Sequence, residues 1–151
     1  LQLKHAAAYP LAAALGRLMA QHFADPLDEL APDVVTAIPL HWIRRVRRGT
    51  NGPATVAEFL ARQRQTDFAD DLLCRSRRTA RQADLAPGNR YRNVRGAFQV
   101  NRRYDLRGAQ VVLVDDVLTT GATCSEAARA LLEGGAARVV ILVVARAAPW
   151  S

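Results

Sequence analysis

Val111-Val-Leu-Val-Asp115-Asp116-Val-Leu-Thr119-Thr120-Gly121-Ala-Thr123 is the most informative segment of this 151-residue chain. Its four leading aliphatic residues predict a strand that is buried on both faces of a parallel sheet. Asp115 and Asp116 would follow at the carboxyl end of that strand, which is the edge where open α/β sheets bind their ligands. A short loop of small and hydroxyl residues comes next. The segment therefore predicts a ligand site between a buried strand and a helix.

A helix is expected from about Thr123 to Glu133. Thr123 and Glu126 have the spacing of a capping box, and Gly134 with Gly135 supplies a C-terminal stop. The face that would pack on the sheet comprises Ala127, Ala128, Leu131 and Leu132. A second apolar run follows over residues 139–145. Residues 111–145 are thus predicted to form one βαβ unit.

The loop that opens this helix predicts an anion site. A helix start presents unpaired backbone N–H groups and the positive end of the macrodipole, which together favour a phosphate. The predicted phosphate-binding residues are Thr119, Thr120, Gly121, Ala122 and Thr123. Ionised carboxylates only accept hydrogen bonds, so Asp115 and Asp116 suit sugar hydroxyls better than a phosphate. A ribose 5-phosphate fits both halves of the motif.

An apolar strand that ends in two aspartates also occurs in receiver domains and in metal-binding phosphatases. A receiver domain places its acidic pair on the first strand and needs a lysine late in the chain, whereas here the pair is late and Lys4 is the only lysine. The chain contains neither G-x-x-x-x-G-K-[ST] nor G-x-G-x-x-G, so the P-loop and dinucleotide-binding motifs are excluded. The phosphatase alternative stays open on this motif alone.

The remaining apolar patterns predict further elements. A helix over residues 4–24 would turn Leu11, Leu15, Leu18 and Met19 inward. Another would start near Asn51 and Pro53 and run to about Gln65. Residues 34–38 predict a buried strand that Pro39 ends, followed by a second loop over residues 39–44. Residues 72–74 and 97–100 predict two short strands, the latter antiparallel.

Residues 76–96 form a polar, arginine-rich tract with few apolar side chains. A tract of this length inside one domain is usually either functional or disordered. A lid that closes over a ligand is the favoured interpretation, and a solvated linker is the alternative.

Composition indicates one domain that can bury a core, with half of its residues hydrophobic. No apolar run has the length of a membrane span and no signal peptide is visible, so a cytoplasmic location without membrane insertion is expected. The net charge of +7 comes almost wholly from arginine, which pairs well with a diphosphate or with nucleic acid. An arginine-rich surface without a partner is the alternative.

The two cysteines do not form a C-x-x-C pair, so no zinc site is indicated. Cys124 lies in the first turn of the helix expected after the aspartates, where a thiol pKa could be lowered. Packing as a small residue is the favoured interpretation.

The chain resembles type I phosphoribosyltransferases, and within them the ComF-type proteins linked to DNA uptake. The segment around Asp115 and Asp116 resembles the loop of that superfamily that binds phosphoribosyl pyrophosphate (PRPP). The other matching motifs are Ile38-Pro-Leu-His41, Arg48-Gly49-Thr-Asn51, Arg78-Thr79 through Gln82, Arg90 through Asn93-Val94, and Ala97-Phe98. Gly52 stands where that family usually has Gln, Thr50 stands where it has Phe, and the family's N-terminal zinc module is absent. We expect a single domain over residues 1–151 that lacks this module.

The resemblance implies an α/β fold with a mainly parallel, Rossmann-like sheet flanked by helices, and a flexible lid loop. It implies PRPP binding with Mg²⁺, which Asp115 and Asp116 would hold indirectly. The catalytic candidates are Asp115, Asp116 and Arg81, and the candidates for the pyrophosphate side are Leu40, His41 and Arg78. The lid candidates are Gln82, Arg90 and Asn93. A homodimer is also expected from the superfamily.

Two classes of function follow. The first is a phosphoribosyltransferase that moves a 5-phosphoribosyl group from PRPP to an unidentified acceptor. The second is a non-catalytic module that senses PRPP or a nucleotide and binds single-stranded DNA or a partner in the uptake machinery. Residues 146–151 after the last expected strand show no recognisable base pocket, which weakens the first class. The intact loop after Asp116 argues against a purely structural protein.

Overall fold

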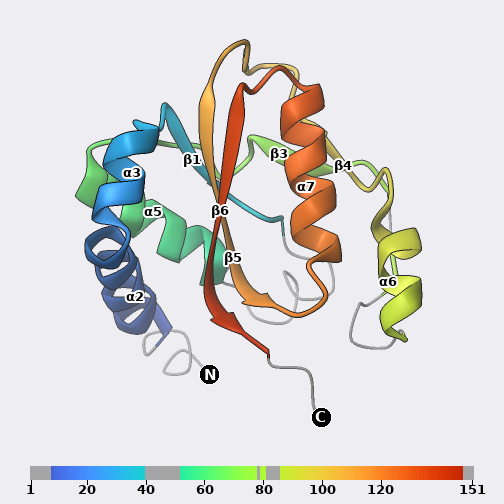
Figure 1. Ribbon diagram of the computed structural model, residues 1–151, viewed down its shortest axis with the longest axis horizontal. Coiled ribbons are helices and arrows are strands. Elements are labelled where there is room, and N and C mark those ends of the chain that lie inside the picture. The colour runs from blue at the N-terminus through green and yellow to red at the C-terminus, as the bar shows by residue number, and fades with distance from the viewer. Residues whose placement is uncertain (1–7, 40–51, 78, 81–85, 148–151) are drawn as a thin grey trace.

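A four-stranded parallel sheet forms the centre of the computed structural model, which describes residues 8–39, 52–77, 79–80 and 86–147 (Figure 1). Its strands are β1 (Val34–Ala37), β2 (Asp67–Phe68), β5 (Gln110–Leu118) and β6 (Arg138–Arg146), in the order β2-β1-β5-β6. Strand β5 lies between β1 and β6, with Val112 level with Val35 on one side and Val140 on the other. The α/β class and the mainly parallel sheet are confirmed.

Helix α7 (Ala122–Glu133) connects β5 to β6, so residues 111–145 do form the expected βαβ unit. Gly134 ends the helix, and the N–H of Gly135 donates to the carbonyl of Leu132. Gly135 has φ of +110°, a backbone conformation that favours glycine. The predicted C-terminal stop is thus confirmed.

Helices cover both faces of the sheet (Figure 1). On one face α2 (Ala8–His22), α3 (Ala24–Leu30) and α5 (Gly52–Arg64) share a core with Val112 and Val114 of β5. On the other face α7 packs over Val111 and Leu113. All four aliphatic side chains are fully buried, as alternation along a strand between two helical layers requires.

A second, two-stranded sheet lies beside α7. Strand β3 (Leu73–Arg75) pairs antiparallel with β4 (Phe98–Val100), and Arg75 is level with Phe98. The two ends of the polar tract over residues 76–96 therefore lie side by side, at the end of β3 and the start of β4. It contains the helix α6 (Pro87–Val94), which lies next to α7 (Figure 1). The two short strands and their direction were predicted correctly, but helix α6 was not foreseen.

The predicted inward faces of two helices are partly wrong. Leu11 and Leu18 of α2 are 62% and 58% exposed, and Leu132 of α7 is 48% exposed. Met19 is buried and Leu15 packs against the core, as predicted. The other buried positions of α2 are small residues, namely Ala12, Ala13, Gly16 and Ala20. The cause is close packing of α2 on α5, since a methyl group on Gly16 would lie 2.6 Å from Cβ of Phe59. Among the residues that the structure describes, no helix has the length and apolar character needed to cross a bilayer.

We expect Gly16→Ala to lower the free energy of unfolding by about 1–3 kcal/mol, the usual cost of overpacking. The new methyl would also meet the carbonyl oxygen of Val56 at 2.7 Å, so α2 would have to move away from α5. Chemical denaturation measures the change. Gly52→Ala is the matched control, because a methyl group there meets nothing within 4 Å. Equal stability of both variants with the wild type would contradict the close α2–α5 packing.

Candidate functional site

The two aspartates lie within β5 rather than after it. The strand continues to Leu118, with Asp115 level with Val143 of β6 and Val117 level with Ala145. Both carboxylates are partly buried, whereas Val117 is 44% exposed. The strand was predicted to end at Val114, but backbone pairing with the long strand β6 extends it by four residues. The aspartates are therefore held on a paired strand rather than on a free loop.

Asp115 points to the α7 side of the sheet, where the thiol of Cys124 donates to its Oδ2 at 3.4 Å. Its Oδ1 accepts the N–H of Asp116 at 2.9 Å. Burial raises the pKa of Asp115 to about 6, and the negative charge of Asp116 contributes to that rise. At neutral pH this carboxylate carries a charge that its surroundings solvate poorly. It gains from any cation or hydroxyl donor that approaches it.

Cys124 is 4% exposed and is held as a neutral thiol. Burial raises its pKa to about 12, and the adjacent Asp115 carboxylate adds to the effect. The idea that the helix start lowers this pKa is therefore wrong, because desolvation and a neighbouring anion outweigh the dipole. Packing as a small residue is confirmed.

Asp116 lies on the opposite face of the strand by alternation, following Val112 and Val114. Its Oδ1 accepts the N–H of Val117 at 2.8 Å. Each aspartate thus accepts the next backbone N–H along the chain, which holds both carboxylates against the end of the strand. Together the two side chains form an acidic rim at the carboxyl edge of the sheet.

The loop after β5 begins α7 with a left-handed residue. Gly121 is the N-cap, with φ of +78°, and no side chain caps the helix. The first intrahelical bond runs from the N–H of Ser125 to the carbonyl of Gly121 at 2.8 Å. Thr119, Thr120, Gly121, Ala122 and Thr123 thus form the turn from β5 into α7, and Val117 and Leu118 separate this turn from the two aspartates. An uncapped helix start beside two carboxylates has the arrangement expected for a sugar phosphate.

The predicted capping box is wrong. Glu126 is 9% exposed and its Oε1 accepts the N–H of Gly96 at 2.5 Å, from the segment that follows α6. Arg129 donates to the same carboxylate from one helical turn further on, at 2.5 and 3.0 Å. These bonds lower the pKa of Glu126, with Arg129 as the largest cause. The carboxylate of Glu126 therefore bonds to Gly96 in another segment, instead of to the start of its own helix as the local spacing predicted.

The loop after β1 starts next to Asp115. The N–H of Ile38 donates to the carbonyl of Val114 at 3.0 Å, so Pro39 follows at the same edge of the sheet. Leu40 and His41, the candidates for the pyrophosphate side, lie outside the described residues. So does Arg78.

Arg75 of β3 is a site residue that the sequence pattern did not single out. Its Nε donates to the carbonyl of Pro39 and its Nη1 to Oγ1 of Thr79, both at 3.1 Å. The guanidinium lies 4.8 Å from the ring centroid of Phe98. Burial lowers the pKa of Arg75, and the charge of Asp115 opposes that effect. Arg75 therefore brings a positive charge to the junction of β1, β3 and β5, although its place beside an arginine-rich tract hid it in the sequence.

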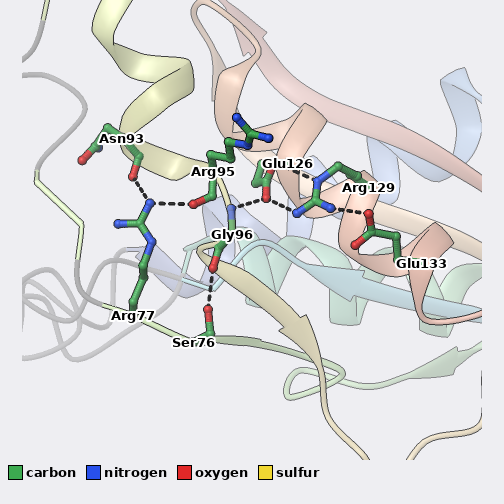
Figure 2. A network of polar contacts seen from close by, with 8 residues as sticks. All are labelled: Ser76, Arg77, Asn93, Arg95, Gly96, Glu126, Arg129 and Glu133. Carbon is green, nitrogen blue, oxygen red and sulfur yellow. Dashed lines mark hydrogen bonds and ion pairs between the residues drawn. The ribbon is translucent and has the colours of Figure 1, made fainter.

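The predicted lid is partly described. Arg90 and Asn93 belong to α6, whereas Arg81 and Gln82 lie outside the described residues. The side-chain amide of Asn93 bonds both to the N–H and to the carbonyl of Ala80, each at 3.0 Å. The carbonyl of Asn93 accepts a bond from Arg77 (Figure 2). Asn93 thus joins the two ends of the tract rather than reaching toward the loop after β5.

Tyr91 of α6 does reach that loop. Its hydroxyl donates to the carbonyl of Thr120 at 2.8 Å. It is the only aromatic residue in the sequence between positions 76 and 96, a signal that sequence reasoning could have used.

The part of the chain that the structure describes contains no metal site built from protein side chains alone. No group of three His, Cys, Asp or Glu side chains gathers there in a way that could hold a metal ion. Asp115 and Asp116 supply two adjacent carboxylates at the sheet edge.

Asp115→Asn should stabilise the fold while changing few contacts. The raised pKa means that the native state binds a proton more tightly than the unfolded chain, so the free energy of unfolding falls as pH rises from about 4 to 6. A neutral amide avoids that loss, which amounts to about 3 kcal/mol at most above pH 6. Thermal unfolding at pH 8 should show the variant to be more stable than the wild type, and the two should converge near pH 4.

Asp105→Asn is the control for that experiment. Asp105 is exposed, and hydrogen bonds from Arg107 lower its pKa to about 2. Its replacement should therefore not stabilise the fold at pH 8. A stability gain for Asp115→Asn that is equally large at pH 4 and pH 8 would contradict a desolvated carboxylate.

Comparisons with known proteins agree with this geometry. The family model of the phosphoribosyl transferase domain matches residues 8–149. The DNA utilization protein YhgH of Escherichia coli (strain K12) is 34% identical over 148 residues, which cover 96% of this chain and 64% of that protein. Competence protein F of Haemophilus influenzae is 29% identical over 117 residues, covering 77% of this chain and 51% of its own. The chain thus spans less than two thirds of the length of these relatives.

Solved structures show the same fold. The glutamine PRPP amidotransferase of B. subtilis superposes with a TM-score of 0.61 at 23% identity, covering 90% of this chain and 26% of that one. The hypoxanthine phosphoribosyl transferase of Trypanosoma cruzi gives a TM-score of 0.55 at 14% identity, covering 95% of this chain and 71% of that one. The match of the family model extends over nearly all of the chain. The chain belongs to the phosphoribosyl transferase domain family, and within it to the ComF-type proteins with the type I phosphoribosyltransferase fold.

Proposed function

We propose that this domain binds PRPP together with Mg²⁺ at the carboxyl edge of β5. The observation that carries the proposal is the direct succession of Asp115, Asp116 and an uncapped helix start with a left-handed glycine at its N-cap. The 5-phosphate would accept backbone and hydroxyl donors from residues 119–123. The ribose 2′- and 3′-hydroxyls would donate to Asp115 and Asp116.

Mg²⁺ fits this arrangement as an ion that arrives with its ligand. Two carboxylates are too few for an all-protein cage, and Mg²⁺ is commonly held by one or two carboxylates with phosphates and water. Asp115 and Asp116 would hold the ion indirectly, through the bound ligand, and the ion would supply positive charge that neutralises the diphosphate. The diphosphate would extend toward the loop after Pro39. Arg75 supports that direction, because it places a cation against the carbonyl of Pro39.

The proposed reaction is transfer of the 5-phosphoribosyl group to an acceptor. The bond between the anomeric carbon and the diphosphate oxygen breaks, and the electron pair leaves with the diphosphate. A lone pair of the acceptor then forms the new bond to that carbon, and the acceptor loses a proton. The sugar passes through an oxocarbenium-like state. The poorly solvated charge of Asp115 would be stabilised by that developing cation, which is the kind of difference between ground state and transition state that accelerates a reaction.

The names of the relatives favour a second candidate. DNA utilization and competence both concern the handling of DNA, and the net charge of +7 suits an anionic partner. The domain would then sense PRPP or a nucleotide and bind single-stranded DNA, or a protein of the uptake machinery, without turnover. A steep fall of DNA affinity with salt concentration would favour DNA as the partner, and a flat response would exclude DNA.

Isothermal titration tests the proposed ligand. PRPP with Mg²⁺ should bind to the wild type with a saturable heat, and Asp116→Asn should weaken binding by about tenfold or more, since a charged hydrogen-bond acceptor is worth about 1.5–3 kcal/mol. Asp105→Asn is the matched control, because it removes the same charge from an exposed side chain that precedes β5 in the chain. Absence of any heat with the wild type would contradict the proposal, as would equal losses in the two variants.

Release of pyrophosphate separates the two candidates. An enzyme should release pyrophosphate from PRPP when a suitable acceptor is present, and a survey of nucleobases, ammonia and glutamine would reveal it. Asp115→Asn should reduce any such rate at pH 8 although it stabilises the fold. PRPP binding with only background release across all acceptors would favour the sensing module.

A further inference from the structure

We propose that Tyr91 is a positioning residue that fixes the orientation of the Thr120–Gly121 peptide in the phosphate loop. This inference rests on the proposed function only for the identity of the ligand. Its starting point is the bond of 2.8 Å from the Tyr91 hydroxyl to the carbonyl of Thr120, which joins α6 to the loop across 29 positions of sequence.

Because the carbonyl of Thr120 and the N–H of Gly121 belong to the same peptide group, a bond to that carbonyl also fixes the direction of that N–H. A trans peptide is planar, and its C=O and N–H point in opposite directions. Cis peptide bonds are absent from the part of the chain that the structure describes. When Tyr91 holds the carbonyl of Thr120 toward α6, the N–H of Gly121 in the same peptide must point away from α6. That N–H is one of the loop donors that the proposed phosphate site requires.

Without this restraint the peptide has freedom to rotate. Gly121 has φ of +78°, and glycine populates positive and negative φ about equally. The N-cap residue has no side chain and makes no capping bond. The N–H of Ala122 donates to Oγ1 of Thr120 at 3.5 Å, a long bond that does not engage the Thr120–Gly121 peptide itself. A methyl group added to Gly121 would lie 3.7 Å from Leu118 and 3.9 Å from the Tyr91 hydroxyl, which are ordinary contact distances. Tyr91 therefore supplies a short bond to the carbonyl of this peptide, which the N-cap residue does not restrain.

A donor can only fix the loop if it is itself fixed. Helix α6 ends in a group of bonds that joins it to β3 and to α7 (Figure 2). Arg77 donates to the carbonyls of Asn93 and Arg95 at 2.9 and 2.6 Å, and the Ser76 hydroxyl donates to the carbonyl of Gly96 at 2.7 Å. Val94 is 1% exposed and anchors the same turn in the core.

Glu126 joins this group to the helix that the loop begins. Its carboxylate accepts the N–H of Gly96, and Arg129 holds the carboxylate in place (Figure 2). Gly96 thus bonds to α7 through Glu126, and Tyr91 bonds to the loop before α7 through the carbonyl of Thr120. The α6 segment therefore contacts the start of α7 at two points. Glu126 holds the C-terminal end of α6 in place, and we call it the anchor of α6.

The test uses Tyr91→Phe, which removes only the hydroxyl of a side chain that is 52% exposed, so that folding is preserved. Ribose 5-phosphate is the probe, because it engages the loop and the aspartates without a diphosphate. We expect its affinity to fall about three- to tenfold, the range for loss of one ordinary hydrogen bond. The Gly121 amide resonance should shift and broaden in the ligand-free protein. Incorporation of 4-aminophenylalanine at position 91, which restores a donor, should reverse both effects.

A second set of variants tests the anchor. Glu126→Ala should broaden the Gly121 resonance although it lies outside the loop, and Glu126→Gln should preserve it by keeping an acceptor for Gly96. Glu133→Ala is the matched control, since Glu133 is the exposed second partner of Arg129 and lies about two turns after Glu126 along α7. A Glu133→Ala effect as large as that of Glu126→Ala would overturn the anchor.

The outcome is distinguishable from failure of the proposed function. If the wild type binds ribose 5-phosphate and Tyr91→Phe binds it equally well with an unchanged Gly121 resonance, the positioning role is overturned. If the wild type binds neither PRPP nor ribose 5-phosphate, the proposed function fails. The Gly121 resonance alone then tests whether Tyr91 orients the Thr120–Gly121 peptide. A shift in Tyr91→Phe then supports the orienting bond, and an unchanged resonance overturns it.

Discussion

The pairing of β5 with parallel neighbours on both sides is the constraint on which the rest of the structure depends. Because β1 and β6 satisfy its backbone, this strand can bury four aliphatic side chains in a row and still carry two aspartates into the edge of the core. The same pairing places the start of the loop after β1 beside Asp115. Everything proposed for the site follows from that placement. A strand at the edge of the sheet would have solvated these carboxylates more fully.

Burial of Asp115 lowers the stability of the fold at neutral pH but suits the proposed contacts with a ligand. A carboxylate with a pKa near 6 is costly to the fold at neutral pH, and Cys124 offers it only a weak thiol donor. Such a group is well suited to meet a cation or sugar hydroxyls that a ligand brings. Replacement by a neutral residue would favour the fold over the proposed chemistry.

The sequence was sufficient for those parts of the structure that depend on local pattern. The run from Val111 to Val114, the two aspartates and the glycines after Glu133 predicted the βαβ unit and the order of the site. Features set by tertiary contacts were missed. Small residues of α2 face α5 because Gly16 permits close approach, which leaves Leu11 and Leu18 exposed. Glu126 bonds to Gly96 instead of capping its own helix, and no periodicity marks Arg75 or Tyr91 as neighbours of the loop.

The most direct measurement is a crystal structure of this domain with PRPP and Mg²⁺. The central claim predicts the 5-phosphate against the backbone of residues 119–123, the ribose hydroxyls on Asp115 and Asp116, and the diphosphate on the side of Pro39 and Arg75. Ligand density elsewhere on the molecule, or a loop after β5 that stays empty at saturating PRPP while the protein remains folded, would contradict it.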